Sequence, residues 1–446
     1  MTIMNKKEPV ILLLGDLVFF LITLWSMLLV RYLEVPSTEL FIEHLIPFSF
    51  LFAVWIIVFF IAGLYEKHTI ILKSRLPSLI FNTQIANSAI AVLFFYFIPY
   101  FGITPKVNLF IYLIISLGLI FLWRIYFVSK LGLKKKQNSI LIGSGKEMVE
   151  LRDEVNNNPS YGLKFVSFVD LKEINDIDFQ EEVINKVYSE NIHSIVIDLK
   201  NKKVEEALPH LYNLIFSHVK FMDMYKVYED IFDRIPLSLV GYNWFLENIS
   251  SKTHIAYDFL KRLMDISVAS VLGFISLVFY PFVLVAVKIE DGGPIFIVQE
   301  RIGRGNKIIK MVKFRSMKAS DSGVWLTEGD DRVTKVGRIL RKTRIDELPQ
   351  LWNILKGDIS LIGPRPDIID LGKKLTSEIP YYTIRNLVKP GLSGWAQIKQ
   401  VNPPQSVAET KLRLSYDLYY IKNRSFILDF KIALKTIKTL LSRTGI

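Results

Sequence analysis

RKTRIDELPQLWNILKGDISLIGPRP, residues 341–366, brings two adjacent carboxylates, Asp346 and Glu347, into a group of cations. Asp346 is a favourable helix N-cap residue, and Pro349 is tolerated only in the first turn of a helix. Gly357 suits the left-handed position that follows a helix. The stretch therefore predicts a short helix that begins at Asp346. Its positive end and the neighbouring cations should favour the ionised form of Asp346 and attract phosphate.

The predicted helix should also have an apolar face, and basic residues should precede it in the sequence. By itself the stretch fits a second interpretation, an acidic cap on a surface helix among solvated cations, because acidic caps are commoner than catalytic pairs. The apolar residues are Leu351, Trp352, Ile354 and Leu355, and the preceding cations are Arg338, Arg341, Lys342 and Arg344.

A Gly-Pro-Arg-Pro corner at residues 363–366 ends the stretch. Proline on both sides of Arg365 limits the freedom of the backbone and should aim the planar guanidinium, a group that suits phosphate oxygens. The alternative is a tight turn that binds nothing.

The composition indicates a basic membrane protein. The chain has 446 residues, enough for two or three domains, and 51% of them are hydrophobic. The 55 Lys and Arg residues exceed the 43 Asp and Glu residues, which leaves a formal net charge of +12. This balance fits positive cytoplasmic faces, anionic lipid headgroups or phosphorylated substrates. No nucleic acid is expected as a partner, because no zinc-finger, homeodomain or RNP pattern occurs.

Cysteine is absent from the chain, which excludes disulfides, thiol nucleophiles and metals bound by Cys. All six His residues precede residue 255, and none of them is assigned a role. Chemistry in the C-terminal part must therefore use carboxylates, hydroxyls or cations.

Four apolar runs fill residues 9–130. Each is close to the roughly 20 residues that cross a bilayer, and the first lacks the cleavage site of a signal peptide. Positive residues flank the runs on one side, so both ends of this block should lie in the cytoplasm. The runs are Pro9–Val30, Leu45–Leu64, Leu79–Phe101 and Val107–Val128, and the positive residues are Lys6, Lys7, Lys67, Lys73, Arg75, Lys130, Lys134, Lys135 and Lys136.

The middle of the chain predicts a small Rossmann-like α/β domain. The nucleotide fingerprint is incomplete, because Gly143 and Gly145 are present but Met148 stands at the third glycine position. A bound nucleotide and a packing or regulatory domain without a cofactor both stay open. The predicted elements are the strands Ser139–Gly145, Phe165–Asp170 and Ile192–Asp198 and the helix Lys146–Asn156.

A further uncharged run, Ile266–Val287, is long enough to cross a membrane. Within it, Pro281 removes a helix hydrogen bond and clashes with the carbonyl four residues earlier. We expect a re-entrant helix over residues 262–289 that enters the inner leaflet, bends near Tyr280-Pro281 and returns, because a broken helix at membrane depth needs support. The alternative is a fifth, kinked span that would place the C-terminus outside the cell.

The segment Gly293–Met317 predicts two strands around a turn at Gly303–Asn306, with many cations. These cations fit the binding of lipid headgroups. Alternatively, Lys313 and Arg315 lie two residues apart on one strand face and bind phosphates. The last helix, Ile427–Ser442, alternates apolar residues with lysines and should lie on the membrane surface.

Five motifs, in order over residues 260–446, resemble the bacterial sugar transferase family. These are monotopic polyprenyl-phosphate hexose-1-phosphate transferases that begin exopolysaccharide, capsule and O-antigen assembly. The resemblance is to the long form, typified by undecaprenyl-phosphate galactose or glucose phosphotransferase, which adds four N-terminal spans and a Rossmann-like insert. The motifs are GPIFIVQERIG (Gly293–Gly303), KFRSM (Lys313–Met317), RIDELPQLWNILKGDISLIGPRP (Arg344–Pro366), PGLSGWAQI (Pro390–Ile398) and YDLYYIKNRS (Tyr416–Ser425).

The resemblance implies a phosphosugar transfer in two steps. Asp346 attacks the β-phosphate of a UDP-hexose and expels UMP, and undecaprenyl phosphate then takes the phosphosugar from the enzyme. Glu347 accepts a proton or positions the metal and substrate, while Mg²⁺ at Asp346 neutralises the diphosphate. The other implied substrate-binding residues are Lys313, Arg315, Arg341, Pro364, Arg365 and Pro366.

Physical chemistry agrees with this scheme. A carboxylate nucleophile is needed where neither Cys nor His is present, and phosphoryl transfer depends mostly on positioning and cations. The resemblance also implies a multi-pass protein of the bacterial inner membrane, with membrane lipids as partners and the catalytic domain on the cytoplasmic face. A homodimer is expected, since the spans and the surface domain leave ample area for one. The sugar stays open among glucose, galactose and an N-acetylated or dideoxy sugar.

Two positions depart from the family pattern: Arg344 replaces a small Ser, and Tyr280-Pro281 replaces Ser-Pro at the re-entrant break. Two other functions compete. A membrane-tethered oxidoreductase or epimerase at Gly143–Gly145 lacks the third glycine and a Tyr-x-x-x-Lys pair. A non-enzymatic scaffold for polysaccharide export requires that Asp346→Asn change nothing.

The expected architecture is thus a membrane α/β protein in three parts. Four transmembrane helices occupy residues 1–133, and a Rossmann-like α/β domain occupies residues 134–250. A monotopic α/β phosphoglycosyl transferase domain with the re-entrant membrane helix occupies residues 255–446.

Overall fold

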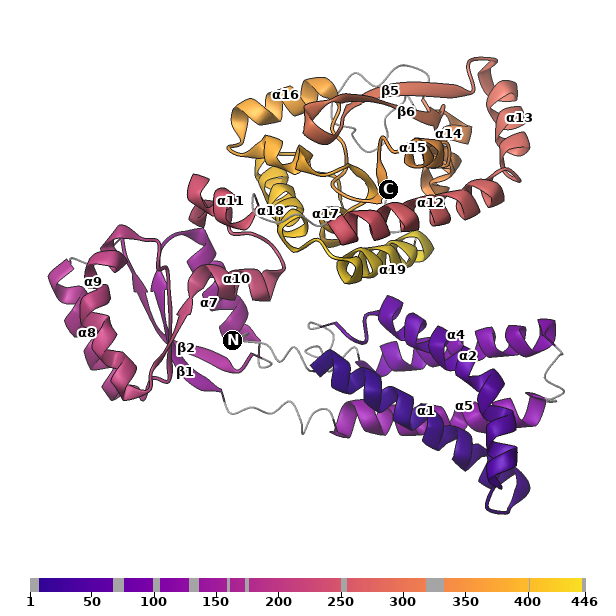
Figure 1. The fold of residues 1–446 in the computed structure, drawn as a ribbon, viewed down its shortest axis with the longest axis horizontal. Coiled ribbons are helices and arrows are strands. Elements are labelled where there is room, and N and C mark those ends of the chain that lie inside the picture. The colour runs from indigo at the N-terminus through magenta and orange to yellow at the C-terminus, as the bar shows by residue number, and fades with distance from the viewer. Residues whose placement is uncertain are drawn as a thin grey trace. The chain divides into compact units, whose positions relative to one another are not determined.

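The structure, a computed structural model, describes residues 8–66, 76–98, 105–127, 136–158, 161–172, 176–249, 255–317, 333–400 and 402–442. The chain divides into two compact units, Met1–Asp230 and Ile231–Ile446. The first unit contains a helical region followed by a sheet region, and the second contains all the motifs of the C-terminal part (Figure 1).

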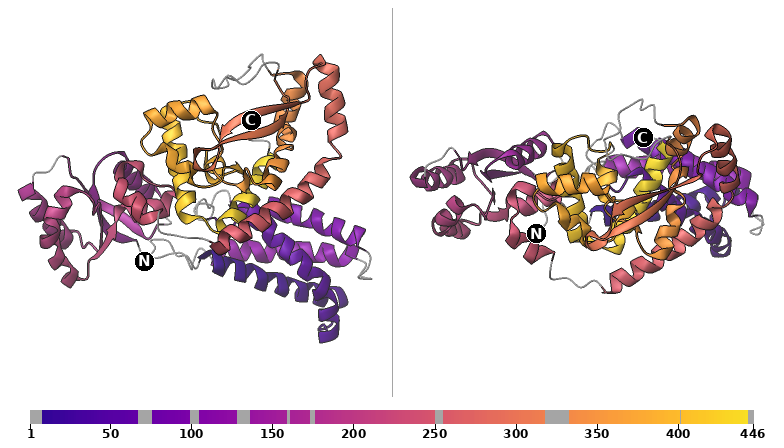
Figure 2. Two further views of the ribbon diagram at one scale, coloured as in Figure 1. Left: turned by 45° about the horizontal axis from the view of Figure 1, so that its top comes forward. Right: turned by 90° about the horizontal axis from the view of Figure 1, so that it is seen from above.

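Four apolar helices form the N-terminal region, as the sequence predicted (Figure 1 and Figure 2). All four are long and apolar enough to cross a membrane. Aromatic side chains fill their core, where Trp55 contacts both Phe20 and Tyr112. The bounds are α1 Glu8–Tyr32, α2 Thr38–Ala62, α4 Leu76–Phe97 and α5 Pro105–Leu122, and the π-helical turn η2 Trp123–Phe127 follows α5.

A buried ion pair joins the first and last of these helical segments. Arg124 of η2 donates to the carboxylate of Asp16 in α1, and the Tyr65 hydroxyl donates to the same carboxylate at 2.7 Å. A buried charge is tolerated when it is paired and hydrogen-bonded. The loop cations behind the topology prediction lie outside the described residues, with the exception of Lys136.

The sheet region is a four-stranded parallel sheet in the order β2-β1-β3-β4. The three predicted strands and the helix after the glycine turn are confirmed with shifted ends, and β4 was not predicted. Helices α8 and α9 cover one face of the sheet, and α7 and α10 cover the other (Figure 1). The Rossmann-like class stays a prediction. The bounds are β1 Gln137–Gly143, α7 Lys146–Asn157, β2 Leu163–Asp170, α8 Asp176–Ser189, β3 Ser194–Ile197, α9 Lys202–Tyr212, η3 Asn213–Ser217, β4 Lys220–Asp223 and α10 Met224–Phe232.

Packing and backbone geometry account for the two glycines of this turn. A Cβ on Gly143 would lie 2.6 Å from the sulfur of Met224, so close packing requires glycine there. Gly145 has φ of 85°, a left-handed value that glycine adopts at little cost. Neither glycine needs a nucleotide to explain it, and nucleotide binding stays an untested prediction.

The second unit begins earlier than residue 250, where the sequence analysis ended the middle domain. Trp395 Nε1 donates to the backbone oxygen of Asp233 at 2.9 Å, and the Asp233 carboxylate pairs with Lys399 at 3.0 Å. The ring of Phe245 contacts that of Tyr381 at 4.6 Å. These contacts attach residues 231–249 to the C-terminal domain. They join segments far apart in sequence, which is why no local pattern predicted them.

Helices α12 (Ile255–Ser276) and α13 (Tyr280–Asp291) form a pair bent by 59° (Figure 2). The bend occupies residues 277–279, where backbone N–H groups bond to carbonyls three residues earlier. Pro281 occupies the first turn of α13, and its ring is incompatible with a helical carbonyl at Leu277. The predicted break is confirmed slightly earlier than Tyr280-Pro281, and the re-entrant course stays a prediction.

The remaining elements surround two small sheets. The predicted hairpin is confirmed as the antiparallel pair β5–β6, which places Lys313 opposite Ile297, and β7 pairs with β8 in parallel. The bounds are η4 Leu237–Leu239, α11 Tyr242–Asn248, β5 Phe296–Ile302, η5 Arg304–Asn306, β6 Ile308–Phe314, α14 Lys335–Thr343, η6 Ile345–Glu347, α15 Gln350–Lys356, β7 Ser360–Ile362, α16 Ile369–Glu378, η7 Tyr382–Leu387, β8 Gly391–Ser393, α17 Trp395–Lys399, α18 Val407–Asn423 and α19 Phe426–Ser442.

Candidate active site

Asp346 lies inside a single 3-10 turn, η6, between helices α14 and α15. The prediction that it caps a helix is wrong, because α15 begins only at Gln350, with Pro349 before it. The backbone conformation of Arg344 explains why a 3-10 turn, and no helix start, occurs at Asp346. Arg344 adopts φ of 59°, which turns the chain sharply after α14, and the N–H of Leu348 then bonds to the carbonyl of Ile345. A left-handed non-glycine residue is strained, and such strain is commonest at functional sites.

Helix α15 is short, and only part of its predicted apolar face is buried. Leu351 and Ile354 are buried, whereas Trp352 is 69% exposed. Trp352 is offset by about 100° around the helix from Leu351, so it faces away from the core. Gly357 ends the helix with φ of 95°, as predicted.

Asn353 attaches α15 to the strand that carries Lys313. Its Nδ2 donates to the backbone oxygen of Lys310 at 2.7 Å, and its Oδ1 accepts from the N–H of Val312 at 3.2 Å. No local pattern in the sequence marks Asn353 for this role. These two hydrogen bonds hold the hairpin cation beside the carboxylate pair.

Three cations surround the carboxylate of Glu347. Its Oε1 lies 2.9 Å from Arg365 Nη2, 3.7 Å from Lys313 Nζ and 3.9 Å from Arg344 Nη1. Burial alone would raise the pKa of Glu347, but the charges of these cations outweigh it and lower the pKa to about 2. Glu347 is therefore ionised throughout the physiological range and holds Arg365 and Lys313 in place.

Asp346 has a different environment from its neighbour. It is 7% exposed, and its Oδ1 accepts no hydrogen bond from the part of the chain that the structure describes. Burial and then the charge of Glu347 raise its pKa to about 6, against the opposing charges of Lys313, Arg344 and Arg341. The expectation that its surroundings favour the ionised form is wrong in sign, because desolvation exceeds the attraction of the cations. The buried oxygen is a candidate nucleophile.

The other predicted substrate-binding residues are only partly brought together. Lys313 lies at the site, where burial lowers its pKa to about 8 against the raising effect of Glu347. Arg341 acts on Asp346 through its charge. Arg315 follows the end of β6, and its guanidinium packs against Gly293, where any Cβ would clash with it.

The predicted corner of Pro364, Arg365 and Pro366 is held by two backbone hydrogen bonds. The carbonyl of Pro364 accepts from the N–H of Gly391 at 3.0 Å, and the N–H of Gly363 donates to Ser393 at 2.8 Å. The corner thus follows directly from the pairing of β7 with β8. It directs Arg365 towards Glu347, and the expected binding of phosphate by the guanidinium stays a prediction.

A buried arginine that sequence analysis missed supports this corner. Arg385 is 2% exposed and donates to the backbone oxygen of Arg365 at 2.8 Å. Its other donors bond to the carboxylates of Asp367 and Asp417 and to the hydroxyl of Tyr382. Among the side-chain partners of Arg385, only Asp417 belongs to a motif found in the sequence, YDLYY. Arg385 is a positioning residue because all its donors are used within the protein.

Asp346 Oδ1 is the oxygen of this site most suited to a cation. Mg²⁺ usually binds through one or two carboxylates together with substrate phosphates. Among the described residues, no three acidic, His or Cys side chains form a metal cluster. The donor set therefore fits Mg²⁺ that arrives with a diphosphate better than a site made by protein ligands alone.

Comparisons with known proteins agree with the geometry. Residues 256–443 match the family model of bacterial sugar transferases. The chain is 37% identical over 259 residues to the UDP-N-acetylgalactosamine-undecaprenyl-phosphate N-acetylgalactosaminephosphotransferase of Aeromonas hydrophila, a match that covers 56% of this chain and 60% of that protein. The aligned region therefore covers less than two thirds of that relative's length.

Two shorter alignments cover more of the related protein. The UDP-glucose:undecaprenyl-phosphate glucose-1-phosphate transferase of Caulobacter vibrioides is 38% identical, over 42% of this chain and 72% of the relative. The exopolysaccharide production protein PSS of Rhizobium leguminosarum is also 38% identical, over 41% of this chain and 96% of the relative.

Proposed function

This chain belongs to the bacterial sugar transferase family, and from that premise we propose that it transfers a hexose 1-phosphate from a UDP-sugar to undecaprenyl phosphate and releases UMP. The names of its relatives support the donor and the acceptor. The observation that carries the proposal is the buried oxygen of Asp346, which has no hydrogen-bond partner among the described residues and lies beside a glutamate held by three cations.

In the first step, Asp346 Oδ1 attacks the β-phosphorus of the UDP-sugar. A bond forms between that oxygen and phosphorus, and the bond from phosphorus to the bridging oxygen breaks, so UMP leaves with the bridging oxygen. Lys313 and Arg365 lie where they can offset the charge that develops on the diphosphate, and positioned cations are the main catalytic device in phosphoryl transfer. The product is an aspartyl phosphosugar.

In the second step, a phosphate oxygen of undecaprenyl phosphate attacks the same phosphorus. The bond between phosphorus and Asp346 Oδ1 breaks, which restores the carboxylate and yields undecaprenyl-diphospho-sugar. A carboxylate serves well here because an acyl phosphate is a reactive intermediate and the chain has no Cys. Mg²⁺, when bound at Asp346 and the substrate phosphates, would supply further neutralisation of charge.

The membrane setting is the second part of the proposal. The bent pair α12–α13 enters the cytoplasmic leaflet and returns, with exposed apolar residues such as Phe274 and Phe282 in contact with lipid. The helix α19 lies on the same surface, and the four N-terminal helices cross the bacterial inner membrane. The catalytic domain then faces the cytoplasm, and its product begins an exopolysaccharide, capsule or O-antigen. Two copies of the chain form a homodimer.

A direct test follows the release of UMP from a panel of UDP-sugars by membranes that contain the protein, with Mg²⁺ and undecaprenyl phosphate. We expect release from one or more UDP-hexoses, and intact-mass analysis of the enzyme without acceptor should detect the added phosphosugar. Asp346→Asn should abolish both signals. Full activity in this variant would refute the role of Asp346, and a lack of release with every donor would refute the reaction.

A further inference from the structure

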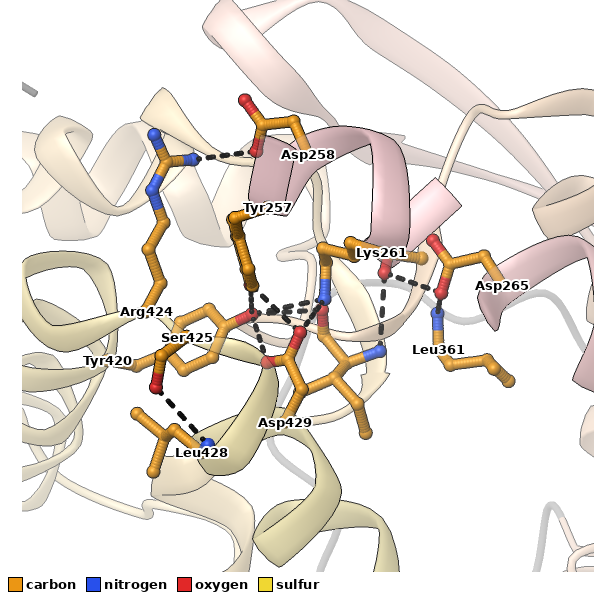
Figure 3. Close-up of polar contacts among 12 residues, drawn as sticks. Tyr257, Asp258, Lys261, Asp265, Leu361, Tyr420, Arg424, Ser425, Leu428 and Asp429 are labelled. Carbon is orange, nitrogen blue, oxygen red and sulfur yellow. Dashed lines mark hydrogen bonds and ion pairs between the residues drawn. The ribbon is translucent and has the colours of Figure 1, made fainter. Parts of the chain in front are cut away.

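Helix α18, which carries Asp417, is held near both of its ends. At its start, the Ser406 hydroxyl accepts from the N–H of Glu409 at 3.2 Å and caps the helix. Near its end, Figure 3 shows Tyr420 directed at Asp429 of α19, to which its hydroxyl donates at 2.9 Å. Side chains between these two points are therefore carried on a fixed helix.

The network around Asp429 pairs its charges within the protein (Figure 3). Lys261 Nζ of α12 lies 2.7 Å from Asp429 Oδ2, and the Tyr257 hydroxyl donates to the same oxygen at 2.8 Å. The side chain of Asp429 is fully buried, and a buried charge is tolerated when it is paired and hydrogen-bonded in this way. This network fastens α12, α18 and α19 to one another, as charges with a structural role do.

Arg413 lies on the same helix, one turn before Asp417, and differs from the charges of that network. Its Nε is buried and has no hydrogen-bond partner among the described residues. A buried donor without a partner costs stability, and native proteins keep few of them. An arginine retained in this state within reach of an active site is a candidate for binding an anionic group of a substrate.

The charges around Arg413 place it next to the corner of Arg365. Burial lowers the pKa of Arg413, and the charge of Asp417 raises it. The positive charges of Arg385 and Arg365 lower this pKa further, and Asp367, the residue directly after the corner, raises it. Arg385 holds the backbone oxygen of Arg365 at 2.8 Å, so both arginines approach the same corner. Of the two, only Arg413 keeps a buried donor that the described residues do not satisfy.

A UDP-sugar requires cations at two successive places, because its two phosphates are joined by one bridging oxygen. In the proposed first step, Lys313 and Arg365 lie beside the carboxylate pair, where the β-phosphate reacts with Asp346. The α-phosphate receives the bridging oxygen and its charge when the bond to the β-phosphorus breaks. A guanidinium next to Arg365 suits that second place, and a monophosphate acceptor needs only the first.

We propose that Arg413 binds the α-phosphate of the UDP-sugar and stabilises UMP as it leaves. The inference rests on the proposed function. The planar fork of a guanidinium matches phosphate oxygens, and a donor carried on a fixed helix needs no reorganisation when charge develops on the leaving group. Arg413 lies outside the five sequence motifs, three residues before the last of them, so no local pattern marked it.

The test compares UMP with uridine, two ligands that differ only in the phosphate, by measuring their dissociation constants for the purified full-length protein. Arg413→Met keeps an apolar stem of similar length and removes the charge. It should weaken the binding of UMP by about 10- to 100-fold, as the loss of a hydrogen bond between charged groups does, and that of uridine by less than about twofold. The value of kcat/KM for the UDP-sugar should fall at least as much, because the charge on UMP is greatest in the transition state.

Lys411→Met is the matched control, because Lys411 is exposed on the same helix and its loss changes the net charge equally. The affinity for UMP and the value of kcat/KM should stay within about twofold of the wild type. Arg413→Lys should recover part of the affinity for UMP, since an ammonium keeps the charge and loses the planar fork. The Tm of Arg413→Met should not fall, because the donor that is removed has no partner in the described part of the chain.

Three results would overturn the inference. Unchanged affinity for UMP in Arg413→Met would exclude the contact, and a lower Tm in the same variant would then leave Arg413 only a structural role. Equal losses for UMP and uridine would show that the substitution damages the site as a whole. A fall confined to kcat/KM for undecaprenyl phosphate, with the affinity for UMP unchanged, would assign Arg413 to the acceptor.

Two further provisions keep the test decisive. If Arg413→Met does not fold, Arg413→Lys carries the same comparison of UMP with uridine, with a smaller loss expected for UMP. A wild-type protein that releases no UMP from any UDP-sugar would remove the proposed function and this inference with it. An active wild type with unaltered affinity for UMP in the variants would refute the inference alone.

Discussion

Asp417 and Asp346 are two buried aspartates of the same unit with opposite surroundings. Asp417, in α18, is 1% exposed, and its Oδ2 accepts from both Nε and Nη2 of Arg385. Asp346 is 7% exposed, and its Oδ1 has no hydrogen-bond donor in the described part of the chain. Burial raises the pKa of both carboxyls, although arginines act in the opposite direction at each.

The two carboxyls differ in whether hydrogen bonds hold them in place. Both residues carry the cost of desolvation, but at Asp417 the hydrogen bonds of Arg385 offset part of that cost, and Arg385 also holds the corner of Arg365. At Asp346 the charges of Lys313, Arg344 and Arg341 offset part of the cost, but Oδ1 accepts no hydrogen bond from the described residues. A buried titratable group with a perturbed pKa and no structural partner is the stronger candidate for chemistry.

The largest expected effect is that of a substitution at Asp346. Asp346→Asn should lower the rate of UMP release by at least about 10³-fold, because the nucleophile is lost. The thermal midpoint Tm at pH 7 should not fall. The pKa of Asp346 is raised to about 6, so its ionised form costs folding free energy above pH 6, and a neutral amide removes that cost. Thermal unfolding of the purified full-length protein measures the second quantity, and a lower Tm would contradict this account.

The second-largest expected effect is that of removing Arg385, the partner of Asp417. Arg385→Ala should destabilise the second unit by about 3–5 kcal/mol, since it leaves the buried carboxylate of Asp417 and the half-buried carboxylate of Asp367 without their arginine partner. The measurement is the free energy of unfolding or the Tm of the full chain. Arg385→Lys should lose less, because it keeps one charge while giving up the fork of donors. Unchanged stability in Arg385→Ala would show that the buried network is dispensable.

The pH dependence of UMP release tests the titration of Asp346 without a mutation. The value of kcat/KM for UMP release should fall about tenfold per pH unit below pH 6, as the nucleophile with a pKa of about 6 becomes protonated. It should also fall above about pH 8, where Lys313 loses its charge. Glu347, with a pKa of about 2, stays ionised throughout this range. A rate that is constant from pH 5 to pH 7 would argue against Asp346 as the titrating group.

The smallest expected effect removes one hydrogen-bonding group from the Arg385 network. Tyr382 donates to Asp367 at 2.9 Å and accepts from Arg385 Nη1 at 3.0 Å. Tyr382→Phe should cost about 1 kcal/mol of stability, as the loss of a typical hydrogen bond does. A lower Tm with the UMP-release profile still centred between pH 6 and pH 8 is the expected result. A shift of that profile would mean that the network also controls the titration of the site.

Local patterns predicted much of this molecule correctly. The four apolar helices, the hairpin that carries Lys313 and the helix end at Gly357 follow from hydrophobic runs, cations around a turn and a glycine. The pairing of Glu347 with Arg365 was not predicted, although the stiff corner around Arg365 was. Each of these features depends on neighbours within a few residues of one another.

Features that depend on distant segments were missed or mistaken. Arg385 had no local signal, because its partners lie as far away as Arg365 and Asp417. The boundary predicted at residue 250 ignored the contact of Asp233 with Trp395. The sign of the pKa shift at Asp346 was wrong because sequence shows the nearby cations and hides the burial.

The sequence by itself determined the chemical inventory and its order: no Cys, no His after residue 254, two adjacent carboxylates and five motifs that identify the family. Only the tertiary structure decided which of the two carboxylates is held by cations and which has an oxygen without a hydrogen bond from the described residues. The physical reason is that desolvation and hydrogen bonding depend on all the atoms packed around a group. For Glu347 and Asp346, these atoms come from segments that are adjacent in space and remote in the chain.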